Sequence, residues 1–481
     1  MTRRSWTAVA AVLLLAAGAA ILVALSGDSK EGPPDESASP VPTAETTVTV
    51  DGGVTFQRID GFGSSERVFD DPHVFENFDK RTGRAKTVVP ADERREIYDR
   101  LYRELRLTRV RPGPDGGIEV ANDNGDPEVT DLSRFDFSWK LTDAHIDYVA
   151  EAMSRGAEVH FVSPAVEDWM ETESGGPAEY AEWAMAMLRR WRDRGYEPPY
   201  YALLNEPGYY GRKVTAWQGA GSYGFSGEYL RDAAKLLGAK LRSEGFATKL
   251  VIPDDIRPSE AFERARVVLE DPGARRYVGA IATHLYGSPT DRSIAYDGLD
   301  ELRSLADSHG LPLWMTEFYW PDAFEWAEIM HRLLHDYRVG AIDYLWGFFG
   351  KWDPAPARLI TLTYDDSTGA YEGYQLEKQY YVFGQFSRFI PVGARRIEAK
   401  ASDDELQTTA YRKGADLTIV AHNSGSAAKT VRFELTGLPG IARVRGTRTS
   451  AEEDWVRLAL PVRDRSFVAA LPPGSITTFV S

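Results

Sequence analysis

Two glutamates follow apolar runs that have the length and composition of buried strands. Glu206 follows Tyr201–Leu204 and Asn205, and Glu317 follows Leu313–Thr316. A buried carboxylate without a partner costs several kcal/mol, so a glutamate in this position needs either a partner or a chemical role. Glycoside hydrolysis uses two facing carboxyl groups, one as acid and base and the other, in retaining enzymes, as nucleophile. Glu206 and Glu317 are therefore the candidate catalytic pair.

Two arginines near the end of the second predicted strand are candidates for holding a catalytic carboxylate. Arg109 is the first choice for such a charge-assisted contact. Arg111 lies two residues further on and faces the same side, so it stays open as the alternative.

Other candidate binding residues are aromatic or polar. His284 and Tyr286 alternate on the sixth predicted strand, and the tyrosine hydroxyl there can hold the nucleophile. Trp346 follows the eighth strand and offers an apolar floor for a sugar ring, and Trp169 is a candidate stacking platform.

The elements that position these residues alternate regularly. Between residues 59 and 349, short apolar runs alternate with amphipathic helices, and the runs end near Gly63, Arg111, Pro164, Glu206, Asp254, His284, Glu317 and Trp346. Eight such units favour a (β/α)8 barrel over a doubly wound sheet, because no glycine-rich nucleotide motif follows the first strand. The carboxyl ends of barrel strands line one cleft, which would bring Glu206 and Glu317 together.

The helices between these strands are predicted from their periodicity and from the glycines that follow several of them. We expect them over residues 90–106, 141–155, 178–194, 227–243 with Ser226 as N-cap, 299–309 and 323–339.

The pattern changes after about residue 378. Short alternating runs over 407–411, 416–421, 429–435, 455–460 and 475–480 are separated by turn residues and predict a β-sandwich. We therefore expect a catalytic barrel over 48–378 and a sandwich over 379–481. Strand material at 46–56 precedes the barrel and could pair with the sandwich.

The first residues have the pattern of an export signal. Arg3 and Arg4 precede an apolar run over 8–25, which predicts a signal peptide over 1–26, with an uncleaved membrane anchor as the alternative. Residues 27–47 are rich in Pro, Ser and Glu and predict a disordered linker. We expect a secreted protein or one tethered to the cell surface.

The composition limits the kinds of molecule that the protein is expected to bind. The chain has 481 residues and a formal net charge of −16, which disfavours nucleic acid and anionic membrane surfaces. It has no cysteine, which excludes disulfides, catalytic thiols and cysteine-ligated metals. The expected partner is a glycan, the expected state is a monomer, and neither a metal nor a cofactor is expected.

Several ordered motifs resemble glycoside hydrolase family 30, within clan A of these enzymes. They are Asn205-Glu206-Pro207, Thr316-Glu317, and the stretches over 59–65, 163–170, 314–317, 384–390 and 471–479. The resemblance implies a retaining mechanism with Glu206 as acid/base and Glu317 as nucleophile. It further implies that Asn205 holds the sugar 2-hydroxyl and that Arg109, His284, Tyr286 and Trp346 are supporting residues.

The sequence departs from the family after the third strand. Glu167 and Asp168 stand where family members more often carry small residues, Pro and Trp. These acids would either contact sugar hydroxyls or form surface salt bridges. Sugar, linkage and endo or exo action stay open.

Three other functions fit the sequence less well. The first is a serine hydrolase: Ala220-Gly221-Ser222-Tyr223-Gly224 resembles a nucleophile elbow, but no strand precedes it. The second is a zinc enzyme: His331 and His335 lie four residues apart on a helix, but the intervening glutamate and a third ligand are missing. The third is a non-catalytic carbohydrate-binding surface protein on the same scaffold, and the presence of both Glu206 and Glu317 argues against it.

Overall fold

The computed structural model describes residues 44–66, 69, 89–113, 118–137, 142–163, 167–171, 176–208, 225–287, 293–351, 357–438 and 440–481. The predicted signal or anchor over 1–26, nearly all of the predicted linker and Ser222 lie outside the described residues. Within the described part, no helix is long and apolar enough to cross a bilayer.

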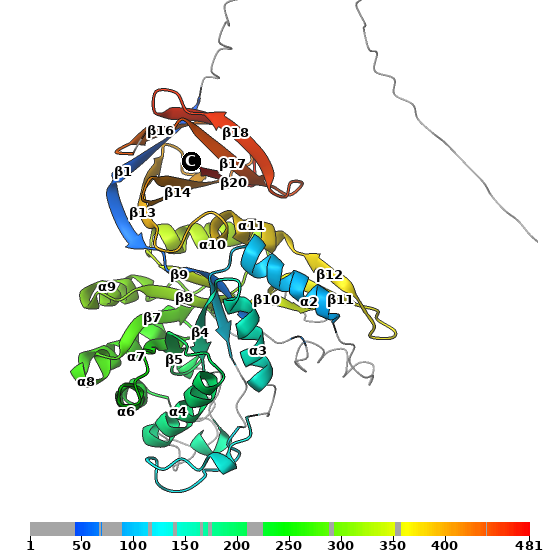
Figure 1. Cartoon of the computed structure of the whole chain (residues 1–481). Helices are drawn as coiled ribbons and strands as arrows, with labels where there is room; N and C mark the ends of the chain where they lie inside the picture. The colour runs from blue at the N-terminus through cyan, green and yellow to red at the C-terminus, as the bar shows by residue number, and fades with distance from the viewer. Residues whose placement is uncertain are drawn as a thin grey trace, which may run out of the picture. The chain divides into compact units, whose positions relative to one another are not determined.

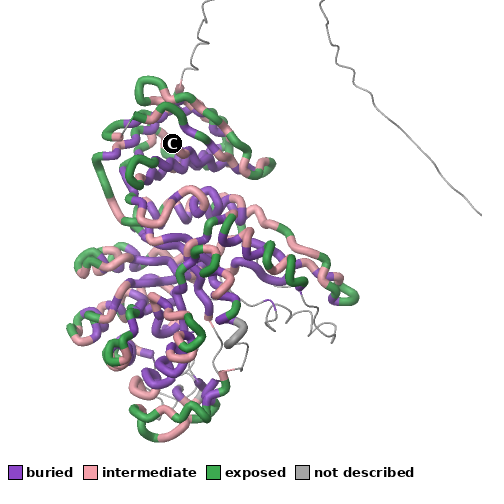
Figure 2. The backbone as a smooth tube through the Cα atoms, viewed as in Figure 1, coloured by how far each residue is buried: buried purple, intermediate pink, exposed green. Residues whose placement is uncertain are grey.

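Eight parallel strands form a closed barrel, which confirms the predicted fold class (Figure 1). In chain order they are β2 (Gly61–Glu66), β3 (Arg109–Pro112), β4 (Glu158–Val162), β5 (Tyr200–Ala202), β6 (Lys249–Asp255), β7 (Val278–His284), β8 (Leu313–Phe318) and β9 (Ala341–Tyr344). Each strand pairs with the next, and β9 closes on β2. The strand residues are almost all buried (Figure 2), which explains their nearly continuous apolar sequences.

Helices join the strands along the outside of the barrel. They are α2 (Ala91–Tyr98), continued by a π-helical segment over Asp99–Glu104, α3 (Thr142–Met153), α4 (Pro177–Asp193), α6 (Gly227–Ser243), α7 (Pro258–Glu270), α8 (Pro272–Arg275), α9 (Leu299–His309) and α10 (Ala323–His335). Short 3-10 turns cover Leu132–Arg134 and Asp168–Glu171. The Ser226 hydroxyl accepts a hydrogen bond from the Tyr229 amide at 3.3 Å, as an N-cap should. The sequence did not predict α7 and α8.

The C-terminal part is a nine-stranded sheet with its own apolar core. Its strands run in the order β18-β17-β20-β15-β14-β13-β1-β16-β19, and the two outermost strands, β18 and β19, contact each other. Stacked Phe433 and Phe467, with Phe479 beside them, centre the core. The strands are β1 (Thr46–Arg58), β13 (Arg395–Ala401), β14 (Leu406–Lys413), β15 (Asp416–Asn423), β16 (Lys429–Thr436), β17 (Arg443–Thr449), β18 (Val456–Pro461), β19 (Ser466–Leu471) and β20 (Ser475–Val480). This domain fits the predicted β-sandwich.

Strand β1 makes the sheet discontinuous in sequence, because it pairs antiparallel with β13 and parallel with β16. Strands β13, β17 and β19 were not predicted.

In the sequence, a small sheet and a helix lie between the last barrel strand and the C-terminal sheet. The sheet contains β10 (Trp346–Gly350), β11 (Arg358–Tyr364) and β12 (Tyr371–Leu376), and α11 (Lys378–Ser387) follows it. Helix α11 reaches the sandwich through Gln385, whose side chain donates to Thr449 Oγ1 at 2.8 Å.

Candidate active site

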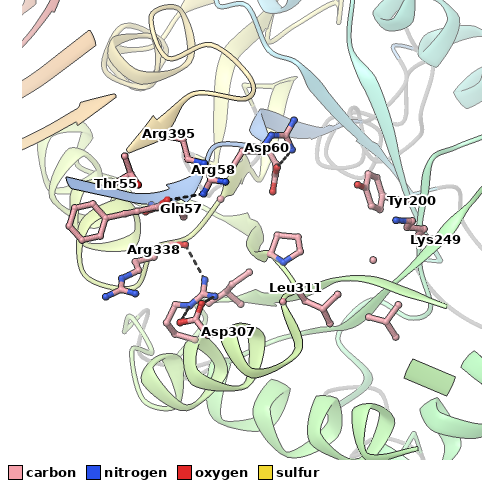
Figure 3. Close-up of a pocket in the computed structure, with 18 residues that line it drawn as sticks. Thr55, Gln57, Arg58, Asp60, Tyr200, Lys249, Asp307, Leu311, Arg338 and Arg395 are labelled. Atoms are coloured by element: carbon pink, nitrogen blue, oxygen red, sulfur yellow. Dashed lines mark hydrogen bonds and ion pairs between the residues drawn. The ribbon is translucent and has the colours of Figure 1, made fainter. Parts of the chain in front are cut away.

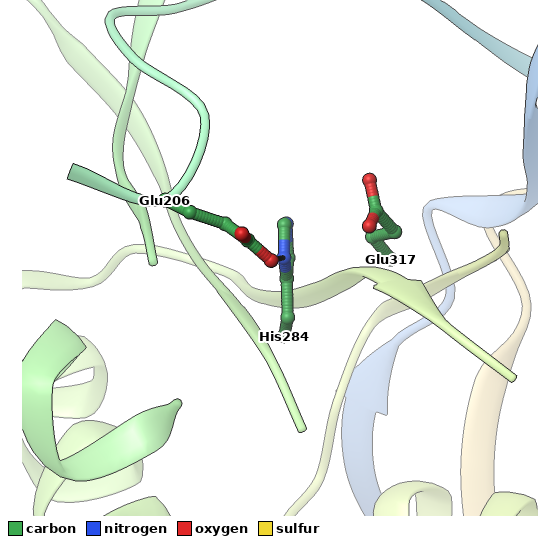
Figure 4. Close-up of side chains that lie close together, drawn as sticks. All are labelled: Glu206, His284 and Glu317. Carbon is green, nitrogen blue, oxygen red and sulfur yellow. Dashed lines mark hydrogen bonds and ion pairs between the residues drawn. The ribbon is translucent and has the colours of Figure 1, made fainter. Parts of the chain in front are cut away.

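The two predicted catalytic glutamates come together at the carboxyl ends of the barrel strands. Glu317 lies on β8 opposite His284 of β7, and Glu206 follows β5 in the next loop. One carboxylate oxygen of Glu206, one of Glu317 and a ring nitrogen of His284 all lie within 4.8 Å of one another (Figure 4). Both carboxylate side chains keep about one seventh of their surface exposed, 15% and 14%, so solvent reaches both of them.

Arg111 connects most of this site. Its Nη1 donates to Glu317 Oε2 at 2.7 Å and to Ser65 Oγ at 2.9 Å. Its Nη2 donates to Asn205 Oδ1 at 2.6 Å and to Asp254 Oδ2 at 2.9 Å. The guanidinium therefore stabilises the negative charge of Glu317 and fixes the amide of Asn205 with a single rigid group.

The preference for Arg109 over Arg111 is wrong. Arg109 forms a bidentate ion pair with Asp343, with Nε–Oδ1 and Nη2–Oδ2 distances of 2.9 and 3.0 Å. Its guanidinium lies over the Trp314 ring. The two arginines share a face of β3, but they differ in depth by roughly 6 to 7 Å, two residues along a strand. Arg109 therefore belongs to the packed interior below the site, and Arg111 to the site itself.

Asp254 is a buried anion behind the site. It accepts hydrogen bonds from Arg111 and from the Thr316 hydroxyl, and its Oδ1 lies 3.7 Å from His284 Nε2. Burial opposes its ionisation, but the charges of Arg111 and His284 hold the pKa of Asp254 well below its ordinary value. Asp254 was predicted only as the end of a strand and without a role, although it ends an apolar run just as the two glutamates do.

His284 is fully buried and holds Glu206. Its Nδ1 lies 3.0 Å from Glu206 Oε1. Burial alone would lower the pKa of His284, but the surrounding carboxylates Glu317, Asp254 and Glu206 raise it to about 10. The Nδ1 atom of the ring is therefore placed to donate to Glu206.

Tyr286 completes the partners of Glu317. Its hydroxyl donates to Glu317 Oε1 at 3.1 Å, as predicted for a group that holds the nucleophile. Burial, followed by the charges of Glu317 and Glu206, raises the pKa of Tyr286 well above its ordinary value. The phenol therefore stays a neutral donor at any pH at which the protein works.

The backbone around Glu206 is held under constraint. Glu206 has a left-handed φ of +50°, which costs a non-glycine residue energy, and its amide donates to the Asp254 carbonyl at 2.9 Å. The buried Asp255 carboxylate accepts from the Gly208 amide at 3.1 Å and pairs with Arg264 at 2.8 Å. These bonds aim Glu206 towards His284.

The loops after β3 and β4 are joined by Trp169 and Glu167. The Trp169 indole donates to the Glu119 carbonyl at 2.8 Å. Glu167 is neither a surface salt bridge nor exposed to a ligand: it is buried and accepts from the amides of Ile118 and Glu119 and from the Trp183 indole. Glu167 is thus a loop anchor, and the side chain of Asp168 lies outside the described part.

Trp346 is the first residue of β10 and is half-buried, with its ring 5.6 Å from that of Phe349. That Trp346 packs against a sugar ring, and that Trp169 stacks on one, remain predictions.

Glu206, His284 and Glu317 also have the atom types and spacing of a three-ligand metal site. The charges in the site do not suit a cation, because Arg111 lies 2.7 Å from Glu317 and the surrounding carboxylates raise the pKa of His284 to about 10, which favours the protonated ring. An imidazolium cannot ligate a metal, since metal binding requires the neutral ring. The cluster is better explained as a carboxylate pair held by cations.

Replacing Asp254 by Asn should change the pH dependence of activity by lowering the pKa of His284. The substitution keeps the shape but removes a charge that helps hold the pKa of His284 near 10, so that pKa should fall. Any alkaline loss of activity that follows His284 deprotonation should then move to lower pH in Asp254→Asn. The pH dependence of kcat, together with an NMR titration of His284, measures both effects. Unchanged profiles in a folded variant would contradict the assignment.

Comparisons with known proteins agree with this architecture. No family model matches the chain. Glucuronoxylanase XynC of Bacillus subtilis is 27% identical over 223 residues, which is 44% of this chain and 48% of that protein. The chain thus matches about half the length of this curated relative.

Solved structures match over nearly the whole chain. A GH30 endoxylanase from Clostridium papyrosolvens C71 has a TM-score of 0.65 at 21% identity, and the match covers 90% of this chain and 99% of that one. The catalytic domain of GH30 xylanase C from Talaromyces cellulolyticus has a TM-score of 0.68 at 20% identity, with the same coverage. These solved structures share the two-domain fold of this chain.

Proposed function

We propose that this protein is an exported retaining β-glycoside hydrolase that cleaves a polysaccharide, with xylan as the first candidate substrate. The observation that carries the proposal is the carboxylate pair: oxygens of Glu206 and Glu317 lie within 4.8 Å of each other at the mouth of the barrel. Retaining enzymes place their two carboxyl groups about 5 to 5.5 Å apart, whereas inverting enzymes leave about 6.5 to 9.5 Å for a water. Xylan is the first substrate to test because the similar proteins are named as xylanases.

The partners of the two glutamates suit different roles. Glu317 accepts from a guanidinium and a phenol, which stabilise it as an anion ready to attack the anomeric carbon. Glu206 has one oxygen held by His284, so its other oxygen is the one to deliver a proton to the leaving group. After the glycosyl-enzyme forms, Glu206 removes a proton from the incoming water and so completes double displacement.

Asn205 has a defined role in this scheme. Its Oδ1 accepts from Arg111, so its amide NH2 is turned away from that cation. The NH2 group can then donate to a sugar hydroxyl next to the anomeric carbon, a contact that strengthens at the transition state.

Product stereochemistry tests the proposal directly. The protein should release reducing sugar from one of a panel of xylans, β-1,3- and β-1,6-glucans and galactans, and proton NMR should show the β-anomer first. Glu206→Gln and Glu317→Gln should abolish release, while the exposed control Glu372→Gln should leave it unchanged. An initial α-anomer would overturn the retaining mechanism. A folded but inactive protein that still binds one of these glycans would instead indicate the non-catalytic carbohydrate-binding function.

A further inference from the structure

The backbone from Glu206 to Gly208 is fixed to the end of strand β6. The Glu206 amide donates to the Asp254 carbonyl at 2.9 Å. Two residues later, the Gly208 amide donates to Asp255 Oδ1 at 3.1 Å. Asp254 and Asp255 are the last two residues of β6. Residues 206–208 are therefore attached at both ends to consecutive residues of one barrel strand.

This double attachment matters because Glu206 has a left-handed φ of +50°. A residue other than glycine keeps such a conformation only where the surrounding structure enforces it. If one attachment weakens, the backbone at Glu206 can relax, and its carboxylate then leaves its place 3.0 Å from His284 Nδ1. The position of the Glu206 carboxyl group thus depends on Asp255 as well as on Asp254.

Asp255 is fully buried and depends in turn on Arg264 of helix α7. Its Oδ2 accepts from Arg264 Nη1 at 2.8 Å, and its Oδ1 also accepts from the Ile256 amide at 2.8 Å. Burial raises the pKa of Asp255, whereas the charge of Arg264 acts against this and lowers it. A buried carboxylate that loses its only cation is strongly destabilised, so it takes up a proton or moves. Arg264 therefore keeps Asp255 in place as the acceptor for the Gly208 amide.

Arg264 also holds the other end of the connection between β5 and α6. Its Nε donates to the Phe225 carbonyl at 3.1 Å. Phe225 directly precedes Ser226, the N-cap of α6, and residues 209–224 between Gly208 and Phe225 lie outside the described part. One guanidinium thus fixes Phe225 directly and Gly208 through Asp255. A planar group with several donors can make both contacts at once, which a single ammonium cannot.

Gly208 packs directly against this ion pair because it has no side chain. A Cβ atom at this position would lie 3.0 Å from Asp255 Oδ1 and 3.1 Å from Arg264 Nη1, and it would overlap with the Glu260 carboxylate. The close approach of backbone to ion pair leaves little room for Gly208 to shift. The position of the pair is thereby passed to the acid two residues earlier.

We infer that Arg264 is a positioning residue for Glu206, which it aligns through the buried carboxylate of Asp255. The inference rests on the proposed function, in which Glu206 protonates the leaving group. A change at Arg264 should therefore slow the step that needs this proton more than a step that does not.

Two aryl β-xylosides with different leaving groups test the inference on the full chain. The value of kcat/KM reports formation of the glycosyl-enzyme, for which a phenyl group needs a proton from Glu206 and a dinitrophenyl group does not. In Arg264→Met, kcat/KM for the phenyl xyloside should fall roughly tenfold or more, a part of the roughly 10²- to 10⁴-fold that a general acid contributes. The dinitrophenyl value should stay within about twofold. An equal loss for both substrates would indicate a merely structural role and would overturn the inference.

Hydrogen exchange measures the attachment without any need for activity. Peptides over residues 203–208 should exchange faster in Arg264→Met than in the unchanged chain, because the Gly208 amide loses its fixed acceptor. Unchanged exchange would overturn the inference whether or not the protein hydrolyses either xyloside. Failure of the proposed function has a different result: the unchanged chain is inactive, while exchange still responds to the substitution.

Two controls remove a cation from the same helix and from the same strand. Arg266→Met alters a side chain two residues further along α7 that is 43% exposed. Lys249→Met alters the exposed first residue of β6, at the end of the strand away from Asp255, where Lys249 lines a hollow of about 670 Å³ (Figure 3). Neither control should change the ratio of the two kcat/KM values.

Arg264→Lys provides a second variant in case Arg264→Met folds poorly. It keeps a charge for Asp255 but cannot also hold the Phe225 carbonyl, so we expect a smaller loss than in Arg264→Met. The phenyl xyloside should still lose more kcat/KM than the dinitrophenyl xyloside. Equal losses in this folded variant would likewise overturn the inference.

Discussion

Azide should rescue alanine variants of the two glutamates with opposite stereochemistry. In Glu206→Ala, kcat should fall roughly 10²- to 10⁴-fold, the usual contribution of a general acid or base. A substrate with a good leaving group, such as a dinitrophenyl β-glycoside, needs no proton for the first step, so the glycosyl-enzyme on Glu317 should accumulate. Azide then attacks the anomeric carbon, displaces the Glu317 carboxylate and gives a β-glycosyl azide.

Glu317→Ala should lose more, on the order of 10⁴-fold or beyond, because no covalent intermediate can form. In this variant azide enters the space of the missing carboxylate and attacks the substrate directly, which gives the α-glycosyl azide. Kinetics with and without azide, with NMR identification of the products, measure both effects. Exchanged stereochemistries would assign the roles of the two glutamates the other way round.

Conservative replacement of the two neighbouring arginines should separate activity from stability. Arg111→Lys keeps a charge beside Asp254 but cannot contact Glu317, Asn205, Ser65 and Asp254 with one planar group. We expect kcat/KM to fall about 10²-fold or more, since misplaced positioning groups have losses of this size. Tm should fall as well, because the Arg111–Asp254 pair is also buried.

Arg109→Lys should lower Tm but leave the activity of the folded protein unchanged. Its loss disturbs the buried pair with Asp343 and the stacking on Trp314, far enough below the site to leave the carboxylates in place. Breaking a buried pair costs about 3 to 5 kcal/mol, and a lysine should recover part of this. Tm and specific activity of the folded fraction, measured for both variants, provide the comparison. A low activity of folded Arg109→Lys would contradict the division between the two arginines.

Much of this protein follows from local sequence patterns. Alternating apolar runs and amphipathic helices predicted the barrel. Helices α6 and α9 have the predicted bounds because Ser226 marks the start of α6 and Gly310 marks the end of α9. Glu206 and Glu317 were recognisable because an ionisable residue at the end of a buried strand is costly unless it has a partner or a role.

Other features depend on tertiary contacts that no local pattern records. The pairing of β1 with β13 and β16 joins segments more than 300 residues apart. Arg109 and Arg111 are equivalent by periodicity, and only the depth at which each meets Asp343 or Glu317 tells them apart. The sequence by itself thus determined the barrel, most of its helices and the carboxylate pair proposed for the chemistry. The tertiary structure decided which cation serves them, because ion-pair partners depend on distances across the barrel rather than on spacing along the chain.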